Sequence, residues 1–317
     1  MKIGMLFPGY GSQYVGMAKE LYDESRTVQE YFEDASNCLK TNFVKLCFAS
    51  SDSDLSRIEN AYTSTFLVSC AIHALLKEEG IVPEVLAGYN LGEYAAIYAA
   101  GGLTFPDGLY LLNKYASIYE EALASMNVGV IRVQGISTKM LELMCKEASS
   151  KNGERVFIAF YNSPTDHVVA GHTDAVAEVR GHVSRDPETT IGEMSVDVGL
   201  HSVLMQEVAD KLAVHLEIVD FNSLAMPMIC SADVCRVETG DQVRARVIEH
   251  VHTPVKWDTV MQSLADCDVL VEVGPGTMLS AMAKVQYPDK IVMSINKRSD
   301  ITDLKKILEP QAPTPEI

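Results

Sequence analysis

The sequence predicts an α/β fold in which an α/β-hydrolase-like domain, built on a parallel sheet, carries an inserted ferredoxin-like (α+β) subdomain. Three observations lead to this prediction. Strand-like and helix-like segments alternate over the first hundred residues, an apolar strand turns sharply into a helix at residues 85–96, and a strand–helix–strand–strand–helix–strand pattern follows residue 127. Alternating strands and helices are typical of a parallel sheet that helices cover on both faces.

The larger part can be followed in order along the chain. Residues 3–7 predict a first buried strand, and helices are expected near residues 13–39 and 64–79. A second strand at residues 84–87 leads into a helix that starts at about Gly92. This succession of apolar strands and longer helical segments favours a parallel sheet.

The pattern of elements changes after residue 126. The expected elements are strands at residues 128–133, 156–161, 168–170 and near 193–196, with helices at 139–148 and 173–183. This order is that of a ferredoxin-like unit. We therefore predict a large domain of residues 1–126 plus 198–317 and a small subdomain of residues 127–197. Ligand sites favour domain interfaces, so a cleft is expected where the two parts meet.

Composition and charge exclude several classes of function. The 317 residues are 47% hydrophobic, which is ample for a large core and a smaller appended one. A net charge of −17 argues against nucleic acid as a partner, because phosphates require a positive surface. The apolar runs are too short to span a bilayer, and the start of the chain is unlike a signal peptide, so we expect a cytoplasmic protein without a membrane partner.

The seven cysteines have no paired motif spacing and no histidine cluster beside them. In a cytoplasmic protein such cysteines are mostly small buried apolar side chains. We therefore expect inert thiols and no metal site. They are Cys38, Cys47, Cys70, Cys145, Cys230, Cys235 and Cys267.

The turn at residues 88–92 has the spacing of a nucleophile elbow. An apolar strand precedes Gly88, and a helix follows Gly92. Small residues at both flanks allow strand and helix to approach closely, so that the apex side chain projects from a strained corner. The apex residue is Asn90, and asparagine tolerates the positive φ expected there. A carboxamide nitrogen is a very poor nucleophile, however, because its lone pair is delocalised into the carbonyl group.

Three stretches resemble the malonyl-CoA:acyl-carrier-protein transacylase family, the acyltransferases of fatty-acid and polyketide synthesis. Residues 7–13 read F-P-G-Y-G-S-Q, residues 88–93 read G-Y-N-L-G-E, and residues 271–276 read V-E-V-G-P-G. These are similar to the family motifs F-P-G-Q-G-S-Q, G-H-S-x-G-E and E-V-G-P-G. Residues 253–257 and 162–164 add two weaker matches, and the order and spacing agree over roughly residues 1–298.

The resemblance implies roles for several residues. In the family an apex Ser attacks the acyl-CoA thioester and a later His acts as base; the matching positions here are Asn90 and His201. The resemblance also implies that a backbone carbonyl near residues 252–255 orients the His201 ring, and that the N–H groups of Tyr10 and Leu91 hold the oxyanion. The implied partners are acyl carrier protein and a coenzyme A thioester, acyl-CoA or malonyl-CoA, as substrate or ligand, with no bound cofactor.

The departures from the family motifs fall on positions that the family uses around its substrate. The malonyl-binding Arg is replaced by Tyr115, which offers one neutral hydroxyl where Arg would grip a carboxylate with two parallel N–H bonds. With Asn90 at the apex, we expect ping-pong transfer through an acyl-enzyme to be impaired or absent. The other departures are Tyr10, Thr63, Tyr89 and Asp166, and Asn162 keeps the family residue at the expected substrate wall.

Three functions stay open on the sequence. The first is S-acyl transfer between coenzyme A and acyl carrier protein by a substituted mechanism, with a pocket at Tyr115 that suits a non-carboxylated acyl group. The second is hydrolysis of an acyl thioester, in which His201 activates water and Asn90 is an added oxyanion donor. The third is a non-catalytic module that binds acyl carrier protein or coenzyme A.

Overall fold

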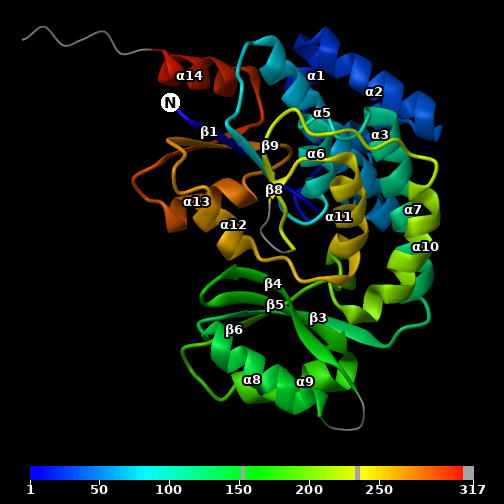
Figure 1. Cartoon of the computed structure of the whole chain (residues 1–317), viewed down its shortest axis with the longest axis vertical. Coiled ribbons are helices and arrows are strands. Elements are labelled where there is room, and N and C mark those ends of the chain that lie inside the picture. Colours follow the sequence, from blue (N-terminus) through cyan, green and yellow to red (C-terminus); the bar gives the residue numbers. More distant parts are fainter. Residues whose placement is uncertain (151–153, 233–235, 310–317) are drawn as a thin grey trace, which may run out of the picture.

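The computed structural model describes residues 1–150, 154–232 and 236–309, and it contains two sheets (Figure 1). The larger sheet has six strands, of which the first five in spatial order pair in parallel and the last pairs antiparallel. The predicted parallel α/β sheet is confirmed. In spatial order its strands are β10 (Ile291–Ile295), β9 (Val269–Val273), β1 (Ile3–Phe7), β2 (Val85–Gly88), β7 (Met228–Ile229) and β8 (Arg236–Val237).

The register of the central strands explains why the three motifs are far apart in sequence. Phe7 at the end of β1 pairs with Gly88 at the end of β2, and Leu6 pairs with Glu272 near the end of β9. Each motif includes the carboxyl end of one of these neighbouring strands. In an open parallel sheet that edge is where ligands bind. The motifs therefore meet at one edge.

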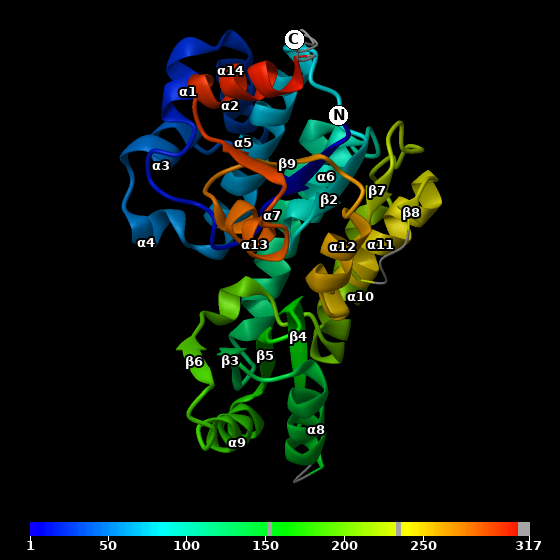
Figure 2. The same cartoon turned by 90° about the vertical axis from the view of Figure 1, so that its left-hand side faces the viewer.

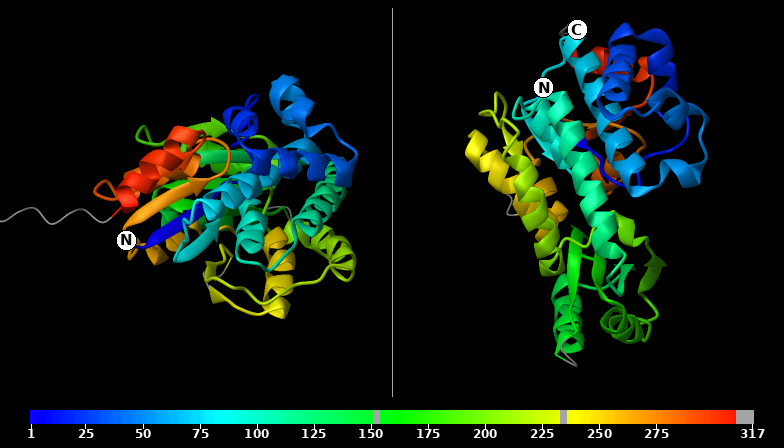
Figure 3. Two further views of the ribbon diagram at one scale, coloured as in Figure 1. Left: turned by 90° about the horizontal axis from the view of Figure 1, so that it is seen from above. Right: turned by 90° about the vertical axis from the view of Figure 1, so that its right-hand side faces the viewer.

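Helices lie on both sides of this sheet (Figures 2 and 3). The helix α5 (Ile58–Glu78) is buried along almost its whole length, because its sequence is apolar or small on every face. It packs against α7 (Phe105–Leu123), and α6 (Gly92–Ala99) packs against β2. The remaining helices of this part are α3 (Phe43–Ala49), α4 (Asp52–Leu55), α10 (Gln206–Leu216), α11 (Gly240–His252), α12 (Trp257–Ser263), α13 (Met278–Gln286) and α14 (Arg298–Leu308).

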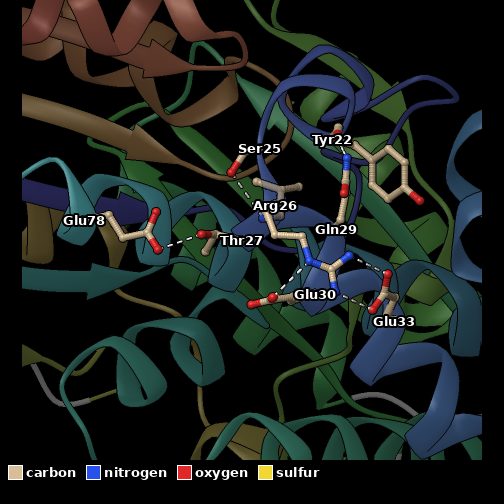
Figure 4. Close-up of polar contacts among 9 residues, drawn as sticks. Tyr22, Ser25, Arg26, Thr27, Gln29, Glu30, Glu33 and Glu78 are labelled. Carbon is tan, nitrogen blue, oxygen red and sulfur yellow. Dashed lines mark hydrogen bonds and ion pairs between the residues drawn. The ribbon is translucent and has the colours of Figure 1, made fainter.

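The helix expected at residues 13–39 is two helices, α1 (Lys19–Glu24) and α2 (Arg26–Leu39). Ser25 between them is extended, and its hydroxyl accepts a hydrogen bond from the Val28 N–H, as an N-cap does. Figure 4 shows this cap and the ion pairs of Arg26 with Glu30 and Glu33 in the turns that follow. The prediction was wrong because a capping serine was read as part of the helix interior. The helix expected to start at residue 64 begins at Ile58.

The smaller sheet is antiparallel, in the order β4-β5-β3-β6. Its elements are β3 (Val128–Gln134), α8 (Thr138–Ser149), β4 (Val156–Ser163), β5 (Asp166–His172), α9 (Thr173–Val183) and β6 (Thr190–Glu193). The strand expected near residues 193–196 ends at Glu193, and a 3₁₀ turn, η1 (Val196–Val198), follows it. The domain boundaries at residues 127 and 197 stay a prediction.

One face of the small sheet joins the core of the large part, while the other face forms a separate core with α8 and α9. Val130, Phe160 and Val168 belong to the shared core. Backbone hydrogen bonds also cross the seam: the Tyr161 N–H donates to the Val255 carbonyl at 2.9 Å, and the Val255 N–H donates to the Ala159 carbonyl at 2.9 Å. Among the described residues, no helix has the length and apolar character needed to cross a membrane.

Candidate active site

The elbow forms where β2 ends and α6 begins, and its tip is Asn90. Asn90 has a φ of +54°, the left-handed conformation that asparagine accepts more readily than most residues. A β-carbon at Gly88 would come within 2.2 Å of the Glu93 nitrogen, and one at Gly92 within 1.9 Å of the Phe7 carbonyl oxygen. Only glycine permits this approach of helix to strands, so the predicted close packing and positive φ are confirmed.

The side chain of Asn90 is buried and hydrogen-bonded to the backbone. Only 1% of its surface is exposed. Its Nδ2 donates to the Val198 carbonyl oxygen at 2.6 Å. The amide group can donate hydrogen bonds in this way, but it offers no nucleophilic lone pair. At the nucleophile position this chain therefore has a structural hydrogen bond.

His201 is fully enclosed and has one oriented ring nitrogen. Its Nδ1 lies 2.9 Å from the His250 carbonyl oxygen, so Nδ1 carries the hydrogen and Nε2 carries the lone pair. The orienting carbonyl was expected near residues 252–255; it belongs to His250, in the last turn of α11. Nε2 is buried without a hydrogen-bond partner. Burial lowers the pKa of His201 to about 4, so the ring is neutral at pH 7.

In the part of the chain that the structure describes, no hydrogen bond joins His201 to Asn90. A β-carbon at residue 199 would come within 2.7 Å of His201 Nε2, so the ring lies directly against Gly199. Asn90 and His201, the two residues predicted to be catalytic, therefore both contact residues 198–199. Asn90 bonds to the Val198 carbonyl, and the His201 ring lies against Gly199.

Two backbone N–H groups, those of Tyr10 and Leu91, were predicted to form an oxyanion hole at the elbow. A β-carbon at Gly9 would lie 3.0 Å from the Leu91 nitrogen, which places the start of the 7–13 turn against the elbow. Within the described ranges, neither the Tyr10 N–H nor the Leu91 N–H has an acceptor from the protein. Free N–H groups beside each other are what an oxyanion hole requires. Their role stays a prediction.

Three tyrosines donate hydrogen bonds to the turn η1, residues 196–198, which we call the strap. The Tyr119 hydroxyl donates to the Val196 carbonyl at 2.6 Å, and the Tyr62 hydroxyl donates to the Asp197 carbonyl at 3.2 Å. The Tyr10 hydroxyl donates to the Asp197 carboxylate at 3.3 Å. Asn90 completes the set through Val198. Tyr115 contributes its ring, packed against Tyr62 and Tyr119 with centroids 5.6 and 6.0 Å away.

The phenols of this group stay protonated. Burial, followed by the charge of Asp197, raises the pKa of Tyr10 to about 12. Burial also raises the pKa values of Tyr62, Tyr115 and Tyr119. None of these shifts has a Lys or Arg among its causes. Tyr115 is therefore a neutral, buried ring, and no Lys or Arg among the described residues contributes to the shift of its pKa.

The other residues predicted to bind substrate are Tyr89, Asn162 and Thr63, and the structure brings only the first two together. Tyr89 donates its hydroxyl to Asn162 Oδ1 at 2.9 Å, and both side chains are buried. Thr63 donates to the Glu59 carbonyl one turn earlier in α5, at 2.7 Å, so its hydroxyl is used within the helix. No contact described here joins Thr63 to the strap or to Asn90.

A cavity of about 700 Å³ lies at the seam between the two parts of the molecule, as predicted. It is lined by β3, β4 and β5 on one side and by α12 and α13 on the other. Asn162 lies on its wall, and Arg132 is held there by Asp166, with Nε to Oδ1 at 2.9 Å. Asp166 is thus an ion-pair partner rather than a replacement for a glutamine amide.

Three residues near the site were not predicted from the sequence: Tyr119, Arg132 and His250, whose buried ring lies next to His201. The His250 ring lies 4.8 Å from the His201 ring, and its Nε2 lies 3.6 Å from Glu93 Oε2. Tyr119 follows Tyr115 by four residues on a helix, a spacing that places two side chains on one face. That spacing could have indicated it; nothing local marks Arg132 or His250. No group of His, Cys, Asp and Glu that could hold a metal ion occurs in the described ranges, which exclude Cys235.

The comparisons with known proteins decide the family. The model of the acyl transferase domain matches residues 5–298. The chain belongs to the acyl transferase domain family. The malonyl CoA-acyl carrier protein transacylase of Bacillus subtilis is 31% identical over 287 residues, which are 89% of this chain and 90% of that protein. The Haemophilus influenzae protein of the same name is 30% identical over 311 residues, covering 97% and 99%.

Solved structures of this acyltransferase family agree with the fold. FabD from Acinetobacter baumannii has a TM-score of 0.91 at 29% identity, over 97% of this chain and 98% of that one. A type II polyketide acyl-carrier protein in complex with its malonyl-transacylase also gives 0.91, at 25% identity over 97% and 100%. The predicted family, its α/β fold and its link to malonyl-CoA, acyl carrier protein and fatty-acid or polyketide synthesis are confirmed. The roles of the individual site residues stay predictions.

Proposed function

We propose that this chain binds the phosphopantetheine arm of coenzyme A and acyl carrier protein, the two carriers that the names of its transacylase relatives give, and that no acyl-enzyme forms on residue 90. One observation carries the second half of the proposal: the Asn90 amide is 1% exposed and bonded to the Val198 carbonyl. Family membership and the seam cavity beside Asn162 support the first half. A cytoplasmic location and the absence of a bound cofactor belong to the same proposal.

The covalent half is tested with ¹⁴C-labelled malonyl-CoA and acetyl-CoA. The protein is incubated with each, denatured and digested, and the peptide containing residues 88–92 is analysed. We expect no label on that peptide, because an amide nitrogen does not take an acyl group from a thioester. A stable adduct on Asn90 that passes to acyl carrier protein would contradict the proposal.

The binding half is tested with holo acyl carrier protein, which has the phosphopantetheine arm, and with the apo form, which lacks it. We expect binding of the holo form that Ala281→Trp weakens, because Ala281 lines the cavity on α13. Lys284→Trp is the matched control, since Lys284 is exposed on the same helix but does not line the cavity. Equal binding of holo and apo carrier, or equal effects of the two tryptophans, would argue against an arm in this cavity.

Thioester hydrolysis is the second candidate, and a single observation favours it. His201 is neutral, and its Nε2 keeps an unshared lone pair beside the elbow. Such a nitrogen can act as a general base toward water. Release of free thiol from acetyl-CoA by the native chain, abolished in His201→Ala, would support hydrolysis. Absence of release from the native chain would leave binding as the function.

A further inference from the structure

The seam cavity offers a chain-like ligand both apolar and amide-type contacts. Trp257, Met261 and Met282 supply apolar surface, while Asn162 and Gln262 supply carboxamide groups. Its volume of about 700 Å³ falls in the range of small-molecule sites. A pantetheine arm is an uncharged chain of methylenes and two amides, and it suits this lining.

The inner end of the cavity is closed by aromatic side chains. Asn162 and Trp257 line the cavity, and both contact Tyr89: the Tyr89 hydroxyl bonds to Asn162, and the Tyr89 ring packs on Trp257 at 5.3 Å between centroids. Tyr89 packs in turn on Phe160 at 5.5 Å, and Phe160 packs on His201 at 4.8 Å. Tyr89 and Phe160 lie behind the cavity-lining residues Asn162 and Trp257, and together they form what we call the inner wall, between those two residues and His201.

The space behind the inner wall is filled by the protein itself. Asn90 and His201 are each 1% exposed, as are Tyr62 and Tyr115. A water-sized sphere therefore hardly touches any of the groups that would surround an acyl chain. Close packing of this kind leaves no room for an added methyl or carboxylate group without displacement of side chains.

We propose that the cavity accepts the unacylated, free-thiol form of the phosphopantetheine arm and excludes its acyl thioesters. This inference rests on the proposed function and specifies which form of the arm is recognised. The thiol, which ends the arm, would lie at the Tyr89–Asn162 pair. An acyl group attached to that sulfur would have to pass through the inner wall.

The experiment measures binding of coenzyme A, acetyl-CoA and malonyl-CoA to the full chain by isothermal titration calorimetry. We expect coenzyme A to bind at least tenfold more tightly than either thioester. Equal affinity for coenzyme A and acetyl-CoA would overturn the inference while leaving the proposed function intact. Failure of all three ligands to bind would overturn the proposed function, and the inference with it.

A pair of variants identifies the inner wall as the cause. Tyr89→Ala removes the ring and opens the cavity toward the elbow, so acetyl-CoA affinity is expected to rise to within about threefold of that for coenzyme A. Tyr89→Phe keeps the ring and loses only the bond to Asn162, so the thioesters stay excluded. The same discrimination in Tyr89→Ala, folded as judged by near-ultraviolet circular dichroism, would contradict the role of the wall. If Tyr89→Ala does not fold, the smaller Tyr89→Leu change gives the same comparison.

Discussion

At position 90, side chain and backbone conformation suit each other. The elbow requires a positive φ, which asparagine tolerates, and the carboxamide reaches the Val198 carbonyl. The same carbonyl would otherwise be a buried acceptor without a partner, which is costly. Asn90 thus stabilises the turn that, in a transacylase, would carry the nucleophile.

Two substitutions at Asn90 separate the backbone and hydrogen-bond contributions. Asn90→Ala loses the bond to Val198 and replaces asparagine with a residue that tolerates the left-handed region less well, so the free energy of unfolding should fall by about 2–3 kcal/mol. Asn90→Gly loses the same bond but adopts the positive φ without strain, and should cost about 1 kcal/mol less than alanine. Urea denaturation measures both. Equal losses would mean that the φ of +54° carries no strain.

The buried histidines make stability sensitive to acid. Burial lowers the pKa of His201 and of His73 to about 4 from an ordinary 6.5, and it lowers that of His250 as well. Between pH 6.5 and 4 these histidines are protonated in the unfolded chain but stay neutral in the folded protein. Their contribution to the free energy of unfolding is therefore fully present above pH 6.5 and decreases as the pH falls toward 4. His201 alone accounts for about 3 kcal/mol of this decrease.

His201→Gln tests this contribution, because glutamine can still donate to the His250 carbonyl but does not titrate. Urea unfolding of both proteins is compared at pH 7 and pH 4.5. The native chain should lose about 2–3 kcal/mol more than the variant over this interval. Equal losses would show that His201 is protonated in the folded state. His215→Gln is the matched control, since His215 is only partly buried, in the last turn of α10, and its Nδ1 bonds to the Tyr110 hydroxyl.

At the scale of an element, the strap is held by side chains from helices that are distant in sequence. Tyr119 lies on α7, Tyr62 on α5 and Asn90 at the start of α6, and each bonds to a different carbonyl of residues 196–198. Three such bonds compensate for a short 3₁₀ turn whose own backbone bonds are few. We therefore expect the strap to be ordered by its surroundings.

Hydrogen exchange tests that dependence. Tyr119→Phe removes the bond to the Val196 carbonyl and leaves the ring, so amide exchange in residues 196–201 should accelerate about tenfold. Tyr110→Phe is the matched control: it lies on the same helix, and its hydroxyl bonds to His215 instead. Acceleration of equal size in both variants would attribute the effect to α7 as a whole.

The features that could be predicted from the sequence at this scale are those encoded by residues close together in the chain. The elbow was predicted because Gly88 and Gly92 mark a turn within five residues, and the parallel sheet because apolar strands alternate with helices. The strap was not, since nothing in residues 196–198 states that tyrosines more than 70 positions away will bond to them. For the same reason the Arg132–Asp166 pair became visible only in three dimensions, whereas the orienting carbonyl was expected near residues 252–255 and lies two residues earlier, at His250.

At the scale of the whole molecule, the two sheets share one core along the seam. Val130, Phe160 and Val168 face that core from the small sheet, and residue 255 is backbone-bonded to β4. If the small sheet separated, these apolar side chains would be exposed at about 1.5–3 kcal/mol each. The seam cavity and its inner wall therefore lie where the two parts of the molecule pack against each other.

We accordingly expect one cooperative thermal transition, with equal calorimetric and van't Hoff enthalpies. Phe160→Ala should destabilise the protein by about 3–5 kcal/mol and shift that single transition as a unit, because the ring packs against Tyr89 and His201 across the seam. Val179→Ala is the contrasting change, because Val179 is a buried residue of α9 that belongs to the separate core. If Phe160→Ala instead splits the calorimetric trace into two peaks, the subdomain folds on its own and the shared core contributes little to its stability.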